Sequence, residues 1–128
     1  MRLYFFIAVL ANLLLVSCKQ ETSTGDDKLQ IVATTGMIGD AVAIIAGDKA
    51  DVTVLMGPGV DPHLYKATQG DLNALRSGDI IFYNGLHLEG KMQEVFDRLA
   101  TTKKVFPVAA GIPESKLRTV AQVNGIST

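Results

Sequence analysis

Residues 30–56 read QIVATTGMIGDAVAIIAGDKADVTVLM, and this stretch decides the fold. The β-branched run at 30–34 predicts a strand. Thr35 is placed to cap a following helix with its hydroxyl. Four apolar residues of that helix recur at helical spacing: Ile38, Ala41, Val42 and Ile45. Gly47 suits the position just past a helix end, and residues 51–56 are again strand-like. The stretch therefore predicts a β–α–β unit, which joins neighbouring parallel strands.

The same alternation continues beyond this unit. The loop 57–68, GPGVDPHLYKAT, leads to a short helix, for which Thr68 and Asp71 approximate a capping box and Gly78 provides the end. Residues 79–83, DIIFY, form a nearly continuous apolar run. Such a run is expected of a strand that helices cover on both faces of a sheet.

The clearest helical pattern follows Asn84-Gly85. Its apolar residues fall at helical spacing: Leu88, Met92, Val95, Phe96 and Leu99. We expect the charged residues of this segment to form its solvated face: Glu89, Lys91, Glu94, Asp97 and Arg98. Residues 104–109 predict a fourth strand. Pro107 places that strand at a sheet edge or ends it, because proline has no amide hydrogen to donate.

The order of elements between residues 29 and 110 is therefore βαβαβαβ. Alternating elements with short links predict an α/β fold, a four-stranded, mostly parallel open sheet flanked by helices. The tail 111–128 contains one proline and two glycines and has no clean helical stripe, so it stays unassigned.

The first residues, MRLYFFIAVLANLLLVSC, have the layout of a secretory signal. Arg2 gives the positive start, and the apolar run after it is too short to span a membrane permanently. We expect residues 1–17 to be removed. Leu15-Val16-Ser17-Cys18 resembles the bacterial lipobox, in which the cysteine is lipidated; a small buried core cysteine is the alternative. The polar segment 18–28 then predicts a flexible tether.

Composition restricts the function classes. Without residues 1–17 the chain has 111 of its 128 residues, enough for one domain. Without residues 1–17 it has 11 basic and 13 acidic residues and no long run of either sign, which argues against nucleic-acid binding. A single cysteine excludes a disulfide framework within the chain. The sequence has no P-loop, GxGxxG, nucleophile elbow, HExxH or CxxC, so we expect it not to be an enzyme.

Two histidines are the candidates for binding chemistry. Open parallel sheets bind ligands beyond the carboxyl ends of their strands, and His63 and His87 follow the second and third predicted strands. Pro62 stiffens the loop around His63, and two glycines before it allow a sharp turn. On residue type alone, a loop histidine that bonds to backbone is the more common explanation. An acid–base pair of Asp61 and His63 lacks a nucleophile or an oxyanion device beside it.

Three segments resemble a known family: IVATTGMIGDAVAIIAGD (31–48), VTVLMGPGVDPHLYKATQGDL (52–72) and DIIFYNGLHLEGKM (79–92). They are similar to the N-terminal lobe of the zinc/manganese-binding lipoproteins of bacterial ABC importers, the cluster A-I solute-binding family, and most of all to its TroA-like branch. The resemblance runs from about residue 31 to 112. It implies one lobe of a two-lobe periplasmic-binding-protein-like fold, with a metal ion between the lobes and His63 as a direct metal ligand.

The same resemblance implies that the other metal ligands lie C-terminal to Thr128. We therefore expect a first lobe, whose residues 111–128 lead toward a missing second lobe. With one protein ligand, we expect the chain by itself to bind Zn²⁺ or Mn²⁺ weakly. His87 usually has no ligand role in the family. The face that packs against the missing part should be exposed and apolar.

Two functions follow, and a third is weaker. The leading one is the extracytoplasmic component of a Zn²⁺ or Mn²⁺ ABC importer, which is anchored to a membrane through Cys18 and delivers the metal to a permease. The alternative is a lipid-anchored structural or adhesin-like interaction protein without a competent metal site. A small α/β enzyme is the third. The lobe does not distinguish the two metals, because imidazole suits zinc and the carboxylates that shift preference toward manganese are absent.

Overall fold

The computed structural model describes residues 28–118. Four strands pair in parallel in one sheet with the order β2-β1-β3-β4. The strands span Leu29–Thr35 (β1), Ala50–Met56 (β2), Ile80–Tyr83 (β3) and Lys104–Pro107 (β4). The helices span Gly36–Ala46 (α2), Gln69–Ser77 (α3) and Gln93–Ala100 (α4). The predicted α/β sheet is confirmed, and β4 lies at its edge, as Pro107 predicts.

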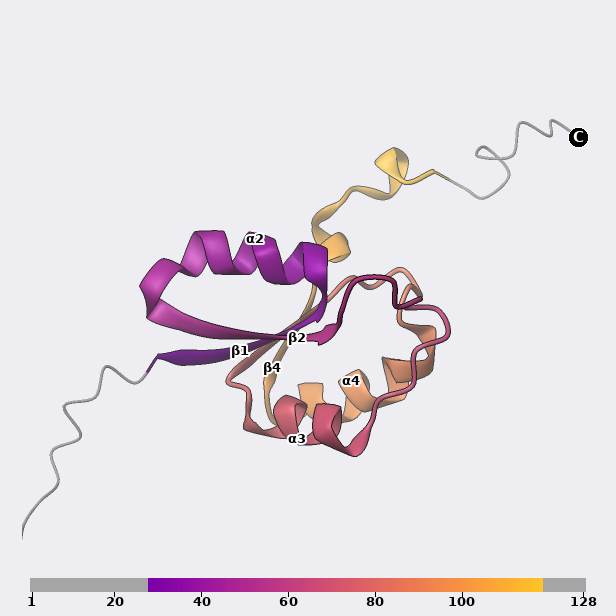
Figure 1. The fold of residues 1–128 in the computed structure, drawn as a ribbon. Coiled ribbons are helices and arrows are strands. Elements are labelled where there is room, and N and C mark those ends of the chain that lie inside the picture. The colour runs from indigo at the N-terminus through magenta and orange to yellow at the C-terminus, as the bar shows by residue number, and fades with distance from the viewer. Residues whose placement is uncertain (1–27, 119–128) are drawn as a thin grey trace, which may run out of the picture.

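The helices lie on two faces of the sheet. Figure 1 shows α2 on one face and α3 and α4 on the other. Helix α2 contacts β1 and β2, and α4 contacts β4. Since all the strands are parallel, their carboxyl ends meet at one edge, where the loops that lead into the helices gather.

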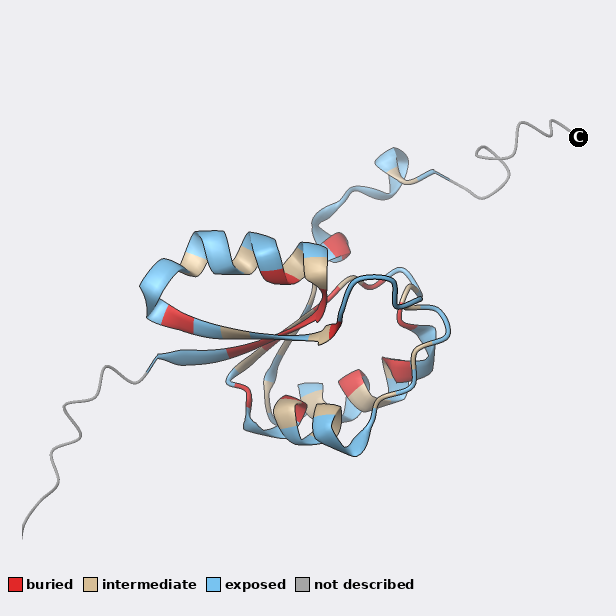
Figure 2. Cartoon of the chain, in the orientation of Figure 1, coloured by how far each residue is buried: buried red, intermediate tan, exposed pale blue. Residues whose placement is uncertain are grey.

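The packed core lies on the face covered by α3 and α4. Its buried residues are Val32, Met56, Leu75, Ile81, Tyr83, Met92 and Phe96. Tyr83 and Phe96 stack with ring centroids 4.4 Å apart. Side chains of a strand alternate between faces, so Ile80 and Phe82 point to the face that carries α2. That face is covered over β1 and β2 by α2, whose outer side is mostly exposed (Figure 2).

Helix α2 differs from the prediction in two ways. Its apolar stripe lies over the sheet, but Ile45 is 85% exposed and only Gly39 of the helix is buried. The reason is that the stripe borders a groove over β3 rather than a packed layer. Thr35 occupies the N-cap position, yet its side chain makes no capping hydrogen bond. That prediction was wrong, because the side chain lines the groove instead.

The helix predicted after Asn84-Gly85 begins later than its apolar spacing suggests. Helix α4 starts at Gln93, and a short 3₁₀ turn, Gly90–Met92, precedes it. Leu88 belongs to a turn before both. The backbone at Gly85, Leu86 and His87 has φ values of 81°, 52° and 63°, which no right-handed helix can contain.

Glu89 was predicted to be solvated, and this was wrong. The residue is 2% exposed, and three donors surround its carboxylate. The sequence contains an indication of this burial. Glu89 precedes the buried Met92 by three residues and the buried Phe96 by seven, so a helical pattern places all three on the same side.

Candidate functional site

The loop 57–68 connects β2 to α3 and carries His63. Its first turn closes with a hydrogen bond of 3.3 Å from the Val60 amide to the Gly57 carbonyl, and Gly59 has a φ of 81°. A Pro-Gly pair suits the middle of such a turn, because proline presets the first φ and glycine tolerates the positive second one. The chain therefore leaves β2 at a defined point.

The second turn of the loop holds His63 itself. The His63 amide donates to Oδ1 of Asp61 over 2.9 Å, and the Leu64 amide donates to the Asp61 carbonyl over 3.2 Å. This arrangement is an Asx turn, in which an aspartate side chain takes the place of a backbone acceptor. The His63 residue is exposed, and its imidazole has no hydrogen bond to another described residue. The loop thus fixes the histidine backbone and leaves the ring available.

A network around Asp71 anchors the far end of the loop. Thr68 and Asp71 form the predicted capping box: the Asp71 amide donates to Thr68 Oγ1, and the Thr68 amide donates to Asp71 Oδ2. The Tyr65 hydroxyl donates to the same Oδ2 over 2.7 Å. Burial, together with the bond to Asp71, raises the pKa of Tyr65 to about 12. Burial opposes ionisation of Asp71, but the bonds from Tyr65 and Thr68 outweigh it and lower its pKa.

The neighbouring rim loop, 84–89, carries His87. Gly85, Leu86 and His87 all lie in the left-handed region, which costs the two non-glycine residues roughly 1 kcal/mol or more each. The Leu88 amide donates to the Gly85 carbonyl over 3.1 Å. His87 is exposed at the edge of a hollow of about 500 Å³ that Tyr83 and Pro107 also line.

The Glu89 carboxylate holds this strained loop. Its Oε1 accepts from the Thr34 hydroxyl over 2.6 Å and from the Asn84 amide over 2.8 Å, and its Oε2 accepts from the Gly85 amide over 3.3 Å. Thr34 is a fully buried residue near the end of β1. One buried carboxylate therefore joins the end of β1 to the loop after β3.

The structure brings both predicted histidines to the carboxyl edge of the sheet, His63 after β2 and His87 after β3. It does not assemble a complete metal site, because within residues 28–118 no three side chains of His, Cys, Asp or Glu lie close enough together to hold an ion. Asp61 bonds only to the backbone amide of His63, which gives no support to an acid–base pair.

No helix in this part of the chain is long and apolar enough to cross a membrane. Cys18 lies outside the described residues.

A family model described as zinc-uptake complex component A, periplasmic (ZnuA), matches residues 31–124. This range contains all of the sheet except the first two residues of β1, and both rim loops. The chain belongs to this family.

Two curated relatives show the range of metals among similar proteins. The manganese-binding lipoprotein MntA of Bacillus subtilis is 48% identical over 120 residues, which cover 91% of this chain and 39% of MntA. The iron ABC transporter substrate-binding lipoprotein MtsA of Streptococcus pyogenes serotype M1 is 39% identical over 116 residues, which cover 82% of this chain and 36% of MtsA. The chain thus spans less than two-fifths of the length of either ZnuA-like relative.

A solved structure agrees with the fold. The periplasmic zinc-binding protein TroA from Treponema pallidum superposes with a TM-score of 0.71 and 50% sequence identity, over 73% of this chain and 34% of TroA. At this identity the likeness extends to sequence as well as to fold. The predicted resemblance to the TroA-like branch, as one lobe of a larger fold, is therefore confirmed.

Proposed function

We propose that the chain is the N-terminal lobe of the extracytoplasmic solute-binding component of a zinc or manganese ABC importer. In this role His63 supplies one ligand to a divalent metal ion that is captured as cargo, and the loaded protein delivers the ion to a permease. Residues 1–17 direct export, a lipid on Cys18 anchors the protein to a membrane on its periplasmic or exterior side, and residues 18–28 act as a tether. The role is binding rather than catalysis.

The observation that carries this proposal is the fixed backbone and exposed ring of His63. The Asx turn orders the residue before any ligand arrives, so less conformational entropy is lost on binding. Family membership supports the same role, since relatives of this lobe are named as manganese-binding and as ABC transporter substrate-binding lipoproteins.

We expect metal binding by this lobe alone to be weak. A zinc site typically has four ligands, and one imidazole leaves the remaining positions to water. The relatives are named for manganese, zinc and iron, so the features they share with this lobe do not select the metal. Exhaustive dialysis should remove added Zn²⁺ or Mn²⁺; stoichiometric retention that depends on His63 would contradict weak binding.

The decisive experiment compares the two histidines of the chain with each other. Titration with paramagnetic Mn²⁺, followed by NMR of the imidazole protons, should broaden the His63 signals at lower metal concentration than those of His87. His63→Gln should abolish the early broadening, and His87→Gln should leave it unchanged. Broadening that starts at His87, or equal broadening of both rings, would refute the assigned ligand.

The second candidate function is that of a lipid-anchored structural or adhesin-like interaction protein. The observation in its favour is the exposed apolar surface around α2, where Met37, Ile44 and Ile45 are 79%, 83% and 85% exposed. If neither histidine responds to Mn²⁺ or Zn²⁺, this candidate becomes the better explanation.

A further inference from the structure

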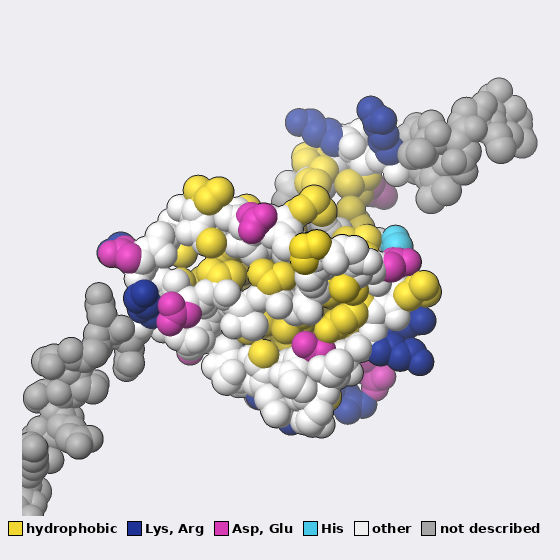
Figure 3. Space-filling view, in the orientation of Figure 1, with side chains coloured by type: hydrophobic (Ala, Val, Ile, Leu, Met, Phe, Trp, Pro, Cys, Tyr) yellow, Lys and Arg dark blue, Asp and Glu magenta, His cyan; other side chains and the backbone are white. Residues whose placement is uncertain are grey.

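The loop 57–68 leads from β2 to α3 (Figure 1), and its side chains differ in burial. Asp61, His63 and Lys66 are exposed. The space-filling view shows acidic, basic and histidine side chains at the surface on this side of the molecule (Figure 3). Tyr65, by contrast, is partly buried and packs against the hydrophobic core on the side of α3 and α4. The loop therefore has an inward-facing side chain two residues after His63.

The Tyr65 hydroxyl joins the loop to two other elements. It lies 2.7 Å from Oδ2 of Asp71, in the first turn of α3, and 3.3 Å from the carbonyl oxygen of Leu55 in β2. A hydroxyl has one hydrogen, so it donates chiefly to the closer acceptor. That acceptor is a carboxylate, and hydrogen bonds to ionised acceptors are the shorter and stronger ones. The Leu55 carbonyl is the weaker, second contact.

The other contacts of the loop are local or apolar. The turn that Gly57 opens and the Asx turn around His63 both join residues within the loop. Ala67 also packs against the core, but its side chain has no polar group. In the part of the chain that the structure describes, residues 58–67 therefore form hydrogen bonds outside the loop only through the Tyr65 hydroxyl.

We infer that Tyr65 is a positioning residue for the metal ligand His63, an inference that rests on the proposed function. The Asx turn fixes the His63 backbone locally, but it does not fix the loop relative to the sheet. The contacts of the Tyr65 hydroxyl with Asp71 and Leu55 do so, and we call them the Tyr65 clamp. Two residues span at most about 7 Å, so the His63 Cα stays within that distance of a held residue. The Thr68 amide and hydroxyl also donate to Asp71 Oδ2, which keeps this oxygen facing the loop.

Precise placement matters to a metal ligand, because metal–ligand distances vary by only about 0.2 Å. In the proposed role, His63 shares the ion with ligands from elsewhere in the protein, so its ring must stay close to one position. A flexible loop moves by roughly 1 Å along each axis. The Tyr65 clamp fastens the loop 57–68 between its two ends and so reduces this motion where the ligand lies.

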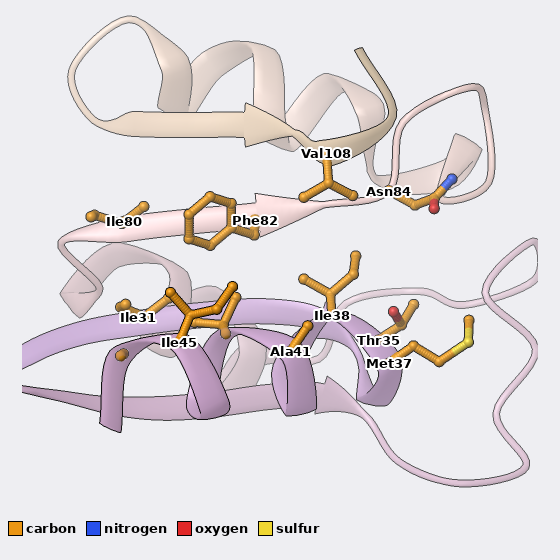
Figure 4. Close-up of a pocket in the computed structure, with 12 residues that line it drawn as sticks. Ile31, Thr35, Met37, Ile38, Ala41, Ile45, Ile80, Phe82, Asn84 and Val108 are labelled. Carbon is orange, nitrogen blue, oxygen red and sulfur yellow. The ribbon is translucent and has the colours of Figure 1, made fainter. Parts of the chain in front are cut away.

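The Tyr65 clamp is separate from the groove beside α2. Its contacts lie within residues 55–71, and none of these residues lines the groove. Figure 4 shows the groove residues on β1, α2 and β3 and just beyond β3 and β4. A change at the Tyr65 hydroxyl therefore leaves that face of the sheet as it is, and its effect can be measured at the loop itself.

The test is NMR relaxation of the backbone amides in residues 18–128 carrying Cys18→Ser, the parent protein, and in its Tyr65→Phe variant. This substitution keeps the ring in the core and removes only the hydroxyl. The order parameters of the amides in 60–66 should fall from about 0.85 to below about 0.6, or these amides should gain slower exchange that the parent lacks. Tyr83→Phe is the matched control, because Tyr83 packs in the same core and its hydroxyl takes no part in the clamp.

Two further variants test the acceptor. Asp71→Ala should loosen the His63 amide as Tyr65→Phe does, because the clamp loses its closer acceptor. Asp71→Asn keeps an acceptor oxygen and should restore the order of the loop. A merely structural role of Asp71 would lower the stability to urea without a change in the order of His63 in the folded protein, and that result would contradict the inference.

Titration of the parent protein with Mn²⁺ separates this inference from the function on which it rests. If the His63 ring of the parent shows no early broadening, the proposed function is wrong, and the positioning role falls with it. If the broadening is present but Tyr65→Phe leaves the loop as ordered as in the parent, only the inference is overturned. The same conclusion follows if Tyr83→Phe loosens the loop equally.

Discussion

The most informative perturbation is the removal of the Glu89 carboxylate. Two of its hydrogen bonds are short, at 2.6 Å from Thr34 and 2.8 Å from Asn84, and the third, from Gly85, is 3.3 Å. A hydrogen bond to a charged group contributes about 1.5–3 kcal/mol. Counting the two short bonds, Glu89→Ala should lower the free energy of unfolding by about 3–6 kcal/mol, which is a large part of the 5–15 kcal/mol typical of a domain.

Glu89→Gln keeps the length of the side chain and one acceptor oxygen, but it replaces the other oxygen with an NH₂ donor. The amide oxygen can still accept from Thr34 and Asn84, but its NH₂ group then faces the Gly85 amide, and two donors cannot pair. The expected loss is about 1–2 kcal/mol, between wild type and Glu89→Ala.

Urea unfolding followed by far-UV circular dichroism at constant pH measures these differences. Glu94→Ala is the matched control, because Glu94 lies five residues further along, is 78% exposed and, among residues 28–118, pairs only with Arg98. Screening by solvent limits that pair, so its loss should cost no more than about 0.5 kcal/mol. If Glu89→Ala lies within 1 kcal/mol of wild type, or if Glu89→Gln is the worse of the two, the explanation of the rim loop given above is wrong.

Three further predictions concern the helices and the loop that carries His63. Gly39→Ala should destabilise the fold by about 1–3 kcal/mol, since a Cβ there would lie 2.3 Å from the stiff Val54 side chain, whereas Gly36→Ala, with nothing within 4 Å, should be nearly neutral in the same urea assay. Thr68→Ala should cost about 1 kcal/mol by removing the capping box, and Thr68→Ser should restore most of it; equal losses would contradict the role of the hydroxyl. Because folding raises the pKa of Tyr65, its stabilising contribution is complete below pH 10 and should disappear as the pH rises toward about 12. The difference in unfolding midpoint between wild type and Tyr65→Phe should therefore shrink between pH 9 and 12, and a constant difference would refute the link.

Local features of the fold could be predicted from the sequence because they depend on residues close in the chain. The capping box needs only Thr68 and Asp71, three positions apart, and it is present as predicted. The strand at 79–83 is recognised from a run of neighbouring apolar residues. Its parallel pairing followed from the alternation of strands and helices, since such connections leave few alternatives.

Burial could not be predicted to the same degree, because it depends on what other elements cover. The spacing of Ile38 and Val42, both partly buried, identifies the side of α2 that faces the sheet, but no pattern within the helix reveals that Ile45 stays 85% exposed beside a groove over β3. The prediction that Glu89 is solvated was wrong for the opposite reason. A glutamate among charged neighbours suggests solvent, and its partners, Thr34 and the amides at 84 and 85, come from elements whose arrangement only the fold defines.

The two rim loops share one structural device, and this device bears on the choice of metal ligand. At the end of each loop an acidic side chain accepts hydrogen bonds from the residues before it: Asp71, in the first turn of α3, accepts from Tyr65 and Thr68, and Glu89 accepts from Asn84 and Gly85. A carboxylate occupied by several internal donors is a poor ligand, because coordinating a metal would leave those donors unpaired. The most obvious anionic ligands of the rim are therefore engaged in positioning loops. If a divalent ion binds at this edge, as proposed, the exposed imidazole of His63 is available to it, whereas the carboxylates of Asp71 and Glu89 are not.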